Sequence, residues 1–98
     1  MILNDKQTKF LRKKGHALKP VVRIGNAGLS EAVINELDLT LTHHELIKVK
    51  IPSGDRGASD ELVAALCQRS GATLVQKIGH VALVYRPSKE LPGIVLPA

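Results

Sequence analysis

The sequence predicts one α/β domain in two layers, with elements in the order α-β-α-β-α-β-β and a mixed four-stranded sheet. Three stretches repeat apolar residues every three to four positions, as amphipathic helices do, and short β-rich runs alternate with them. The last two runs are separated only by Gly79-His80, which is the spacing of a tight hairpin. Strands joined through helices imply right-handed crossovers, whereas a hairpin pair is antiparallel, so the sheet is expected to be mixed.

Length and composition predict a single domain over residues 1–98, with a core over about residues 4–87 and a tail over 88–98. The 98 residues include 44% hydrophobic residues, which argues against disorder. One cysteine excludes an internal disulfide and is typical of a reducing compartment. We find no signal peptide and no apolar run of about 20 residues, so we expect a cytoplasmic protein without membrane contact. A monomer is the default expectation.

The first helix is predicted to begin at an Asn4 or Asp5 cap and to run to about Lys14, with Gly15 ending it in a left-handed turn. One side of this helix carries Leu3, Gln7, Phe10, Leu11 and Lys14. Another side carries a basic stripe of Lys6, Lys9 and Lys13, flanked by Arg12. The helix is therefore expected to be amphipathic.

The next stretch predicts a short buried strand over residues 21–24, a tight turn over 25–28 and a helix capped by Ser30. The turn consists of Gly25, Asn26, Ala27 and Gly28. Glycine lets a backbone come close to a ligand, and free amides at the positive end of a helix favour phosphate. The turn is therefore a candidate phosphate cradle. On the residues alone, a purely structural turn is the commoner explanation.

The remaining elements follow the same periodicities. A second helix is predicted over residues 31–43, with an apolar stripe of Val33, Ile34, Leu37 and Leu41. A strand over 45–51 alternates, and a third helix is expected to begin at a Ser59 cap and to stop at Gly71. Strands over 73–78 and 81–86 complete the sheet. The second and third helices are expected on one face of the sheet, and the first helix near an edge or end.

Charge points to a polyanionic partner. The formal net charge is +5, and seven of the 14 lysines and arginines lie in the first 24 positions, opposed there only by Asp5. A solvated cationic helix is the alternative. With only Phe10 and Tyr85 as aromatic residues, binding of single strands on stacked aromatic platforms is disfavoured.

Six basic residues are candidates for phosphate contacts. Lys9, Lys13, Lys19 and Arg23 could form a continuous track with the glycine turn, and Lys48 and Lys50 lie on the polar face of their strand. The strand lysines extend this surface only if the first helix leaves them uncovered. Otherwise their aliphatic chains lie against the protein and only their ammonium groups reach water. A second GXXG pattern over residues 54–57 also precedes a helix, but Asp55 would repel a phosphate there.

Metal binding and catalysis find little support. His43-His44-Glu45 lies at a helix end, where a cationic or hydrogen-bonding histidine complements the helix dipole, and the lone Cys67 completes no zinc set. No nucleophile elbow, paired acidic ligands or P-loop is present. We therefore expect no enzyme, no cofactor, no metal and no small-molecule substrate.

Several blocks of the sequence resemble the YhbY family, whose fold is also the CRM (chloroplast RNA splicing and ribosome maturation) domain. The blocks are Lys6-Gln7, Leu11, His16, Leu18-Lys19-Pro20-Val21-Val22, Ile24-Gly25-Asn26-Ala27-Gly28-Leu29, His43-His44-Glu45-Leu46-Ile47-Lys48-Val49-Lys50, Asp55-Arg56, Ile78-Gly79 and Tyr85-Arg86-Pro87. They span about residues 6–87 in the family's order. Gly15 stands where relatives more often carry alanine.

The resemblance implies an RNA-binding module in which residues 25–28 act like the GXXG loop of KH domains, which clamps the nucleotide backbone. It adds Arg56 and Arg86 to the expected RNA-binding residues. It also implies ribosomal RNA in the large-subunit precursor as the partner, and a fold similar to the C-terminal domain of bacterial initiation factor three and to Alba-type proteins. The alternatives are an Alba-like DNA-binding protein, or a protein-interaction adaptor on the ribosome that uses an exposed apolar tail, Ile94-Val95-Leu96.

Overall fold

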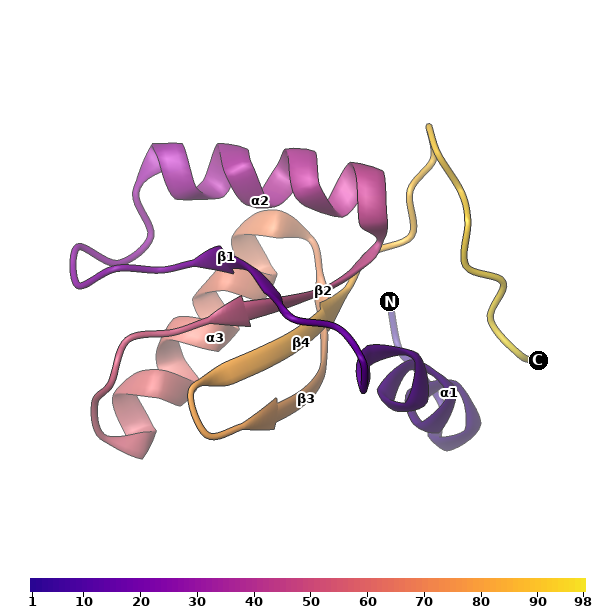
Figure 1. The fold of residues 1–98 in the computed structure, drawn as a ribbon, viewed down its shortest axis with the longest axis horizontal. Helices are drawn as coiled ribbons and strands as arrows, with labels where there is room; N and C mark the ends of the chain where they lie inside the picture. The colour runs from indigo at the N-terminus through magenta and orange to yellow at the C-terminus, as the bar shows by residue number, and fades with distance from the viewer.

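The computed structural model describes all 98 residues and contains three helices and one four-stranded sheet (Figure 1). The elements are α1 (Asp5–Gly15), β1 (Pro20–Arg23), α2 (Glu31–His44), β2 (Leu46–Lys50), α3 (Arg56–Ser70), β3 (Thr73–Ile78) and β4 (Val81–Tyr85). Their order is the predicted one. No helix combines the length and the apolar character that crossing a membrane requires.

The sheet is mixed, as predicted, with strand order β1-β2-β4-β3. β1 runs parallel to β2, whereas β4 is antiparallel to both β2 and β3. β1 is therefore an edge strand, and only its inward face is buried. Val22 is buried but Val21 is exposed, so the expectation of a strand buried throughout is wrong for Val21.

The helices α2 and α3 cover one face of the sheet, as expected. The apolar stripes of both helices meet the inward residues of β1, β2 and β4 in the main core. Its fully buried members include Val22, Ile24, Leu37, Leu41, Ile47, Val49, Val63, Leu66 and Val84. Alternation along β2 follows the predicted pattern, because Ile47 and Val49 point into this core.

The opposite face, which we call the outer face, is covered only at one end, by α1 and the C-terminal tail (Figure 1). A second, smaller core forms there from Leu11, Leu46, Val75, Leu83 and Tyr85. An Asn4–Gln7 capping box begins α1: the Asn4 side chain accepts from the Gln7 amide at 2.8 Å, and the Gln7 side chain accepts from the Asn4 amide at 3.1 Å. The rest of the outer face remains open.

Gly15 does not end α1 in a left-handed turn, and that prediction is wrong. Gly15 is the last helical residue, and His16 after it keeps right-handed backbone angles. A Cβ on Gly15 would lie 2.6 Å from Leu83 Cδ2, so the glycine lets α1 approach the sheet closely, and a larger residue here would make the Leu83 side chain shift.

The start of α3 also differs from the prediction. The N-cap is Asp55 rather than Ser59, and its carboxylate accepts from the Ala58 amide at 2.8 Å. Ser59 is buried inside the helix. The helix does end at Gly71 as predicted, with φ 75° and its amide bonded to the Cys67 carbonyl.

The tail is ordered against the second core, so the expectation of an exposed apolar tail is wrong for two of its three residues. Ile94 and Leu96 are half-buried in that core, and only Val95, at 85% exposure, faces away from the protein. The buried Glu45 carboxylate accepts from the amides of Gly93 and Ile94 at 2.8 and 2.7 Å. A buried carboxylate thus holds the tail.

Candidate nucleic-acid interface

The turn over residues 25–28 is closed by a hydrogen bond from the Gly28 amide to the Gly25 carbonyl at 3.0 Å. Gly28 has φ 77°, a conformation that favours glycine, whereas Gly25 has no positive φ. A Cβ added at either position would have no neighbour within 4 Å. The backbone therefore favours glycine at position 28 but gives no steric reason for it at position 25.

Helix α2 begins directly after this turn and leaves several amides unpaired. The Ser30 side chain accepts from the Val33 amide at 3.2 Å, and the Ser30 carbonyl accepts from the Ile34 amide, so the predicted cap is confirmed. Other amides in the turn and first helical turn have no acceptor within the protein: those of Asn26, Ala27, Leu29, Glu31 and Ala32. These donors lie at the positive end of the helix dipole, where an anion is stabilised.

Arg69 of α3 binds the residues that directly follow the turn, a contact that the sequence analysis did not predict. Its guanidinium donates to the Leu29 carbonyl at 3.1 Å and to the Glu31 carboxylate at 3.1 Å. Glu31 is the first residue of α2, and an unpaired carboxylate there would repel phosphate. Arg69 lies about 40 positions along the chain from both partners, so no local sequence signal reveals this pairing.

The second GXXG pattern, over residues 54–57, is a poorer anion site. Asp55 caps α3, so its carboxylate both occupies the Ala58 amide and puts a negative charge at the helix start. Arg56, the first residue of α3, is exposed and remains a predicted RNA contact. The geometry agrees with preferring the first glycine turn.

The parallel register of β1 and β2 brings their basic residues together. Arg23 pairs with Lys50, and Pro20, next to Lys19, pairs with Lys48. Because Val22 and Val49 point into the main core, Arg23, Lys48 and Lys50 alternate to the outer face. Arg23 and Lys50 are exposed and Lys48 is half-buried, so α1 leaves this face open.

A groove of about 340 Å³ lies on the same outer face, beside the contact between the C-terminal end of α1 and the sheet. Basic groups lie around it, and no acidic residue lines it. The basic lining residues are Arg12, His16, Lys19 and Lys48. Lys9 and Lys13 are exposed on α1 but do not line the groove. The outer face therefore carries one basic surface, which we define as Lys19, Arg23, Lys48 and Lys50 with the adjoining groove.

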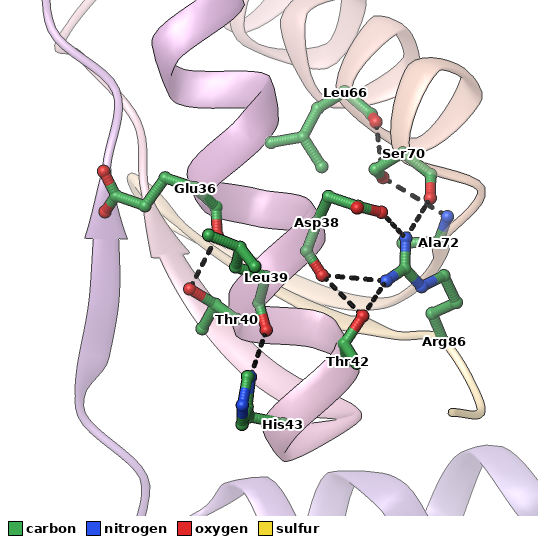
Figure 2. A network of polar contacts seen from close by, with 10 residues as sticks. All are labelled: Glu36, Asp38, Leu39, Thr40, Thr42, His43, Leu66, Ser70, Ala72 and Arg86. Atoms are coloured by element: carbon green, nitrogen blue, oxygen red, sulfur yellow. Dashed lines mark hydrogen bonds and ion pairs between the residues drawn. The ribbon is translucent and has the colours of Figure 1, made fainter. Parts of the chain in front are cut away.

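Arg86, which was predicted to contact RNA, lies apart from this surface and bridges α2 and the end of α3 (Figure 2). Its guanidinium donates to Asp38 Oδ1 at 2.7 Å and to the Ser70 carbonyl at 2.9 Å. It also donates to the Asp38 carbonyl and to Thr42 Oγ1. With its donors engaged and its side chain 19% exposed, Arg86 has a structural role, and we leave it out of the interface.

Two other residues with chemically reactive side chains, His43 and Cys67, also have structural roles. The ring of His43 lies 2.8 Å from the Leu39 carbonyl, and because a carbonyl only accepts, Nδ1 carries the proton (Figure 2). This confirms the predicted hydrogen-bonding role at the helix end. Burial raises the pKa of the Cys67 thiol, which packs against the main core as a small apolar side chain.

Comparison with known proteins gives consistent results. A family model described as the CRS1 / YhbY (CRM) domain matches residues 3–86. An RNA-binding protein of Haemophilus influenzae is 44% identical over 88 residues, covering 90% of this chain and 89% of that protein. A probable RNA-binding protein of Bacillus subtilis is 35% identical over 96 residues, covering 98% and 100%.

Similarity in structure agrees with similarity in sequence. The solution structure of a Staphylococcus aureus protein, described as a candidate for RNA binding, superimposes with a TM-score of 0.83 at 38% identity. The match covers 98% of this chain and 100% of that protein. The predicted fold class is thereby confirmed.

Proposed function

Because this chain belongs to the CRS1 / YhbY (CRM) domain family, we propose that it binds RNA through the glycine turn and the basic surface of the outer face. The parallel register that sets Arg23 beside Lys50 and Pro20 beside Lys48 is the observation that carries this proposal. It supports one cationic surface that runs from the turn to the groove. The relatives named as RNA-binding proteins support the same class of partner.

In this proposal the turn binds one phosphate. A phosphate near Gly25 and Gly28 accepts from the unpaired amides of residues 26–32, and the dipole of α2 stabilises its charge. Gly25 follows Lys19 by six positions, which corresponds to roughly 20 Å of extended chain at about 3.3 Å per residue. Lysines and arginines along this path then contact the following phosphates and release counterions.

The partner we propose is ribosomal RNA in the large-subunit precursor, with the protein assisting assembly of that subunit. This identity follows the resemblance to stand-alone bacterial members of the family. Most contacts of the basic surface would go to phosphates, and few side chains are positioned to contact base edges, so we expect recognition of RNA shape more than sequence.

A matched pair of substitutions at Gly28 tests the turn. Asparagine and aspartate have nearly the same shape and both tolerate positive φ, so Gly28→Asn and Gly28→Asp differ chiefly in charge. In binding titrations with ribosomal RNA fragments, we expect Gly28→Asp to bind at least about tenfold more weakly than Gly28→Asn, with equal circular dichroism spectra. Equal affinities of the two variants would contradict a phosphate at the turn.

Salt dependence and a DNA competitor complete the experiment. With four to six phosphate contacts, the logarithm of the association constant should fall with the logarithm of salt concentration at a slope of about −3 to −5. Duplex DNA should compete poorly against structured RNA. A clear preference for the duplex would favour the Alba-like DNA-binding alternative instead.

A further inference from the structure

The lining of the groove between α1 and the outer face combines apolar and basic side chains. The apolar lining residues include Leu18, Ile78 and Val81, and Ile78 is 67% exposed although it is a large apolar side chain. The basic lining residues are Arg12 and His16 at the α1 end, together with cations of the basic surface. Solvent-exposed apolar side chains in a concave site indicate a ligand with an apolar part.

From this combination we propose that the groove binds one unstacked nucleobase of the RNA whose phosphates lie on the basic surface; the inference rests on the proposed function. A nucleobase has apolar faces that match the apolar lining residues, and the phosphates that flank it match the basic ones. No acidic residue lines the groove, so its charge complements a polyanion.

The size of the groove agrees with this occupant. A volume of about 340 Å³ lies near the lower end of the range for small-ligand pockets. The groove therefore suits a group of the size of a nucleotide.

Planar and amide side chains supply the remaining contacts. The guanidinium of Arg12 and the imidazole of His16 are flat groups on which a base can stack. The Gln76 side chain carries both a donor and an acceptor for the polar edge of the base. Stacking on such groups needs no aromatic residue, which reconciles base binding with the scarcity of aromatics in this chain.

The groove is continuous with the basic surface through the sheet. Lys48 pairs with Leu83 and Lys50 pairs with Val81 in the β2–β4 ladder, and both β4 residues line the groove. An RNA strand that follows Lys50 and Lys48 therefore arrives at the groove. The proposal predicts a preference for RNA with an unpaired nucleotide over a fully paired helix.

The test compares two RNA hairpins that differ only by one bulged nucleotide, replaced by the fluorescent base 2-aminopurine. Wild-type protein should bind the bulged hairpin about fivefold or more tightly than the paired one, since base stacking is worth about 1–3 kcal/mol. The fluorescence of the bulged base should change on binding. Ile78→Ser, at an exposed position of the groove lining, should reduce the preference to less than about twofold.

Two controls distinguish the contribution of the groove to RNA binding from that of the turn. Leu39→Ser makes a similar change at an exposed position of α2 outside the groove and should keep the preference. Gly28→Asp should weaken binding of both hairpins by the same factor. Equal binding of the two hairpins by the wild type, or a preference that survives Ile78→Ser, would overturn the groove proposal and point to another occupant, such as an acidic peptide. If the hairpin preference holds but Gly28→Asp does not weaken binding, the result would instead contradict the proposal that the turn binds a phosphate.

Discussion

Glu45 has a backbone conformation that non-glycine residues rarely adopt, with φ 62°, and its side chain is only 3% exposed. Such a conformation costs about 1–3 kcal/mol, so other interactions must offset it. Three backbone amides donate to the carboxylate, those of Ser88, Gly93 and Ile94, at 2.7 to 2.8 Å. One residue at the α2–β2 junction therefore fixes the path of the tail.

The first prediction concerns the charge on Glu45. Burial raises the pKa of its carboxyl, but the three amide hydrogen bonds together bring this pKa below the ordinary value of 4.5. A lowered pKa means that the stabilisation is complete above about pH 4.5 and is lost as the pH falls through the lower, folded-state pKa. The protection of the Gly93 and Ile94 amides, relative to the exchange rate of an unfolded chain at the same pH, should therefore be high at neutral pH and fall only in acid.

A substitution checks the same prediction. Glu45→Gln has only one acceptor oxygen, so either the Ser88 amide, which donates to Oε2, or the Gly93 and Ile94 amides, which share Oε1, lose their partner. We expect about 1–3 kcal/mol lower stability, together with lower protection of the amides that lose their partner. Slow exchange in the variant would show that the apolar packing of Ile94 and Leu96 alone holds the tail.

The second prediction distinguishes the roles of Gly25 and Gly28 in stability and in RNA binding. Gly25→Ala should leave the free energy of unfolding unchanged or raise it by about 0.4–1 kcal/mol, because the backbone accepts alanine there and the Cβ meets open space. Gly28→Ala should lower it, since φ is 77°. Both should weaken RNA binding, as a Cβ obstructs the approach of a phosphate. If Gly25→Ala binds RNA like the wild type, close approach occurs elsewhere.

At the scale of elements, the sequence predicted features that depend on residues close together in the chain, and it did not predict features that depend on residues far apart. Periodicity and turn residues predicted all seven elements and the Ser30 cap, because these depend on neighbours in the chain. The role of Gly15 was missed because it depends on Leu83, and the start of α3 because two capping residues, Asp55 and Ser59, lie four positions apart. Arg69 and the fixed tail depend on pairs about 40 to 50 positions apart.

The third prediction concerns the link between α2 and α3. Arg69→Gln frees the Glu31 carboxylate beside the unpaired amides, so RNA affinity should fall several-fold. Stability should change by less than about 1 kcal/mol, because an exposed ion pair contributes little. The double variant Arg69→Gln with Glu31→Gln should recover most of the affinity. If it does not, Arg69 acts by contacting RNA or by holding the Leu29 carbonyl, and not by neutralising Glu31.

The fourth prediction concerns the basic stripe of α1. Replacing Lys9 and Lys13 by glutamine should make the salt dependence of RNA binding shallower by about 1–2 in slope. The control replaces Lys77 and Lys89 by glutamine, two lysines that are not among the expected RNA contacts, and so changes the net charge by the same amount. Equal effects of the two double variants would mean that net charge alone, and not the position of the stripe, governs affinity.

For the whole molecule, the two faces of the sheet have different roles: one packs against helices, and the other carries the basic surface. α2 and α3 cover one face and form the main core there, whereas α1 and the tail cover only one end of the other. The open remainder carries the basic surface and adjoins the glycine turn through β1. The packed tail leaves only Val95 as an exposed apolar residue between positions 94 and 96, which weakens the adaptor alternative.

Amide chemical shifts during titration with a ribosomal RNA fragment test the central claim most directly. If a phosphate occupies the turn, the amide resonances of Asn26, Ala27, Glu31 and Ala32 should move most, while those at the start of α3, such as Arg56 and Gly57, stay in place. Large shifts at the start of α3 with none between residues 25 and 32 would contradict the account and assign the RNA contact to the other glycine pattern.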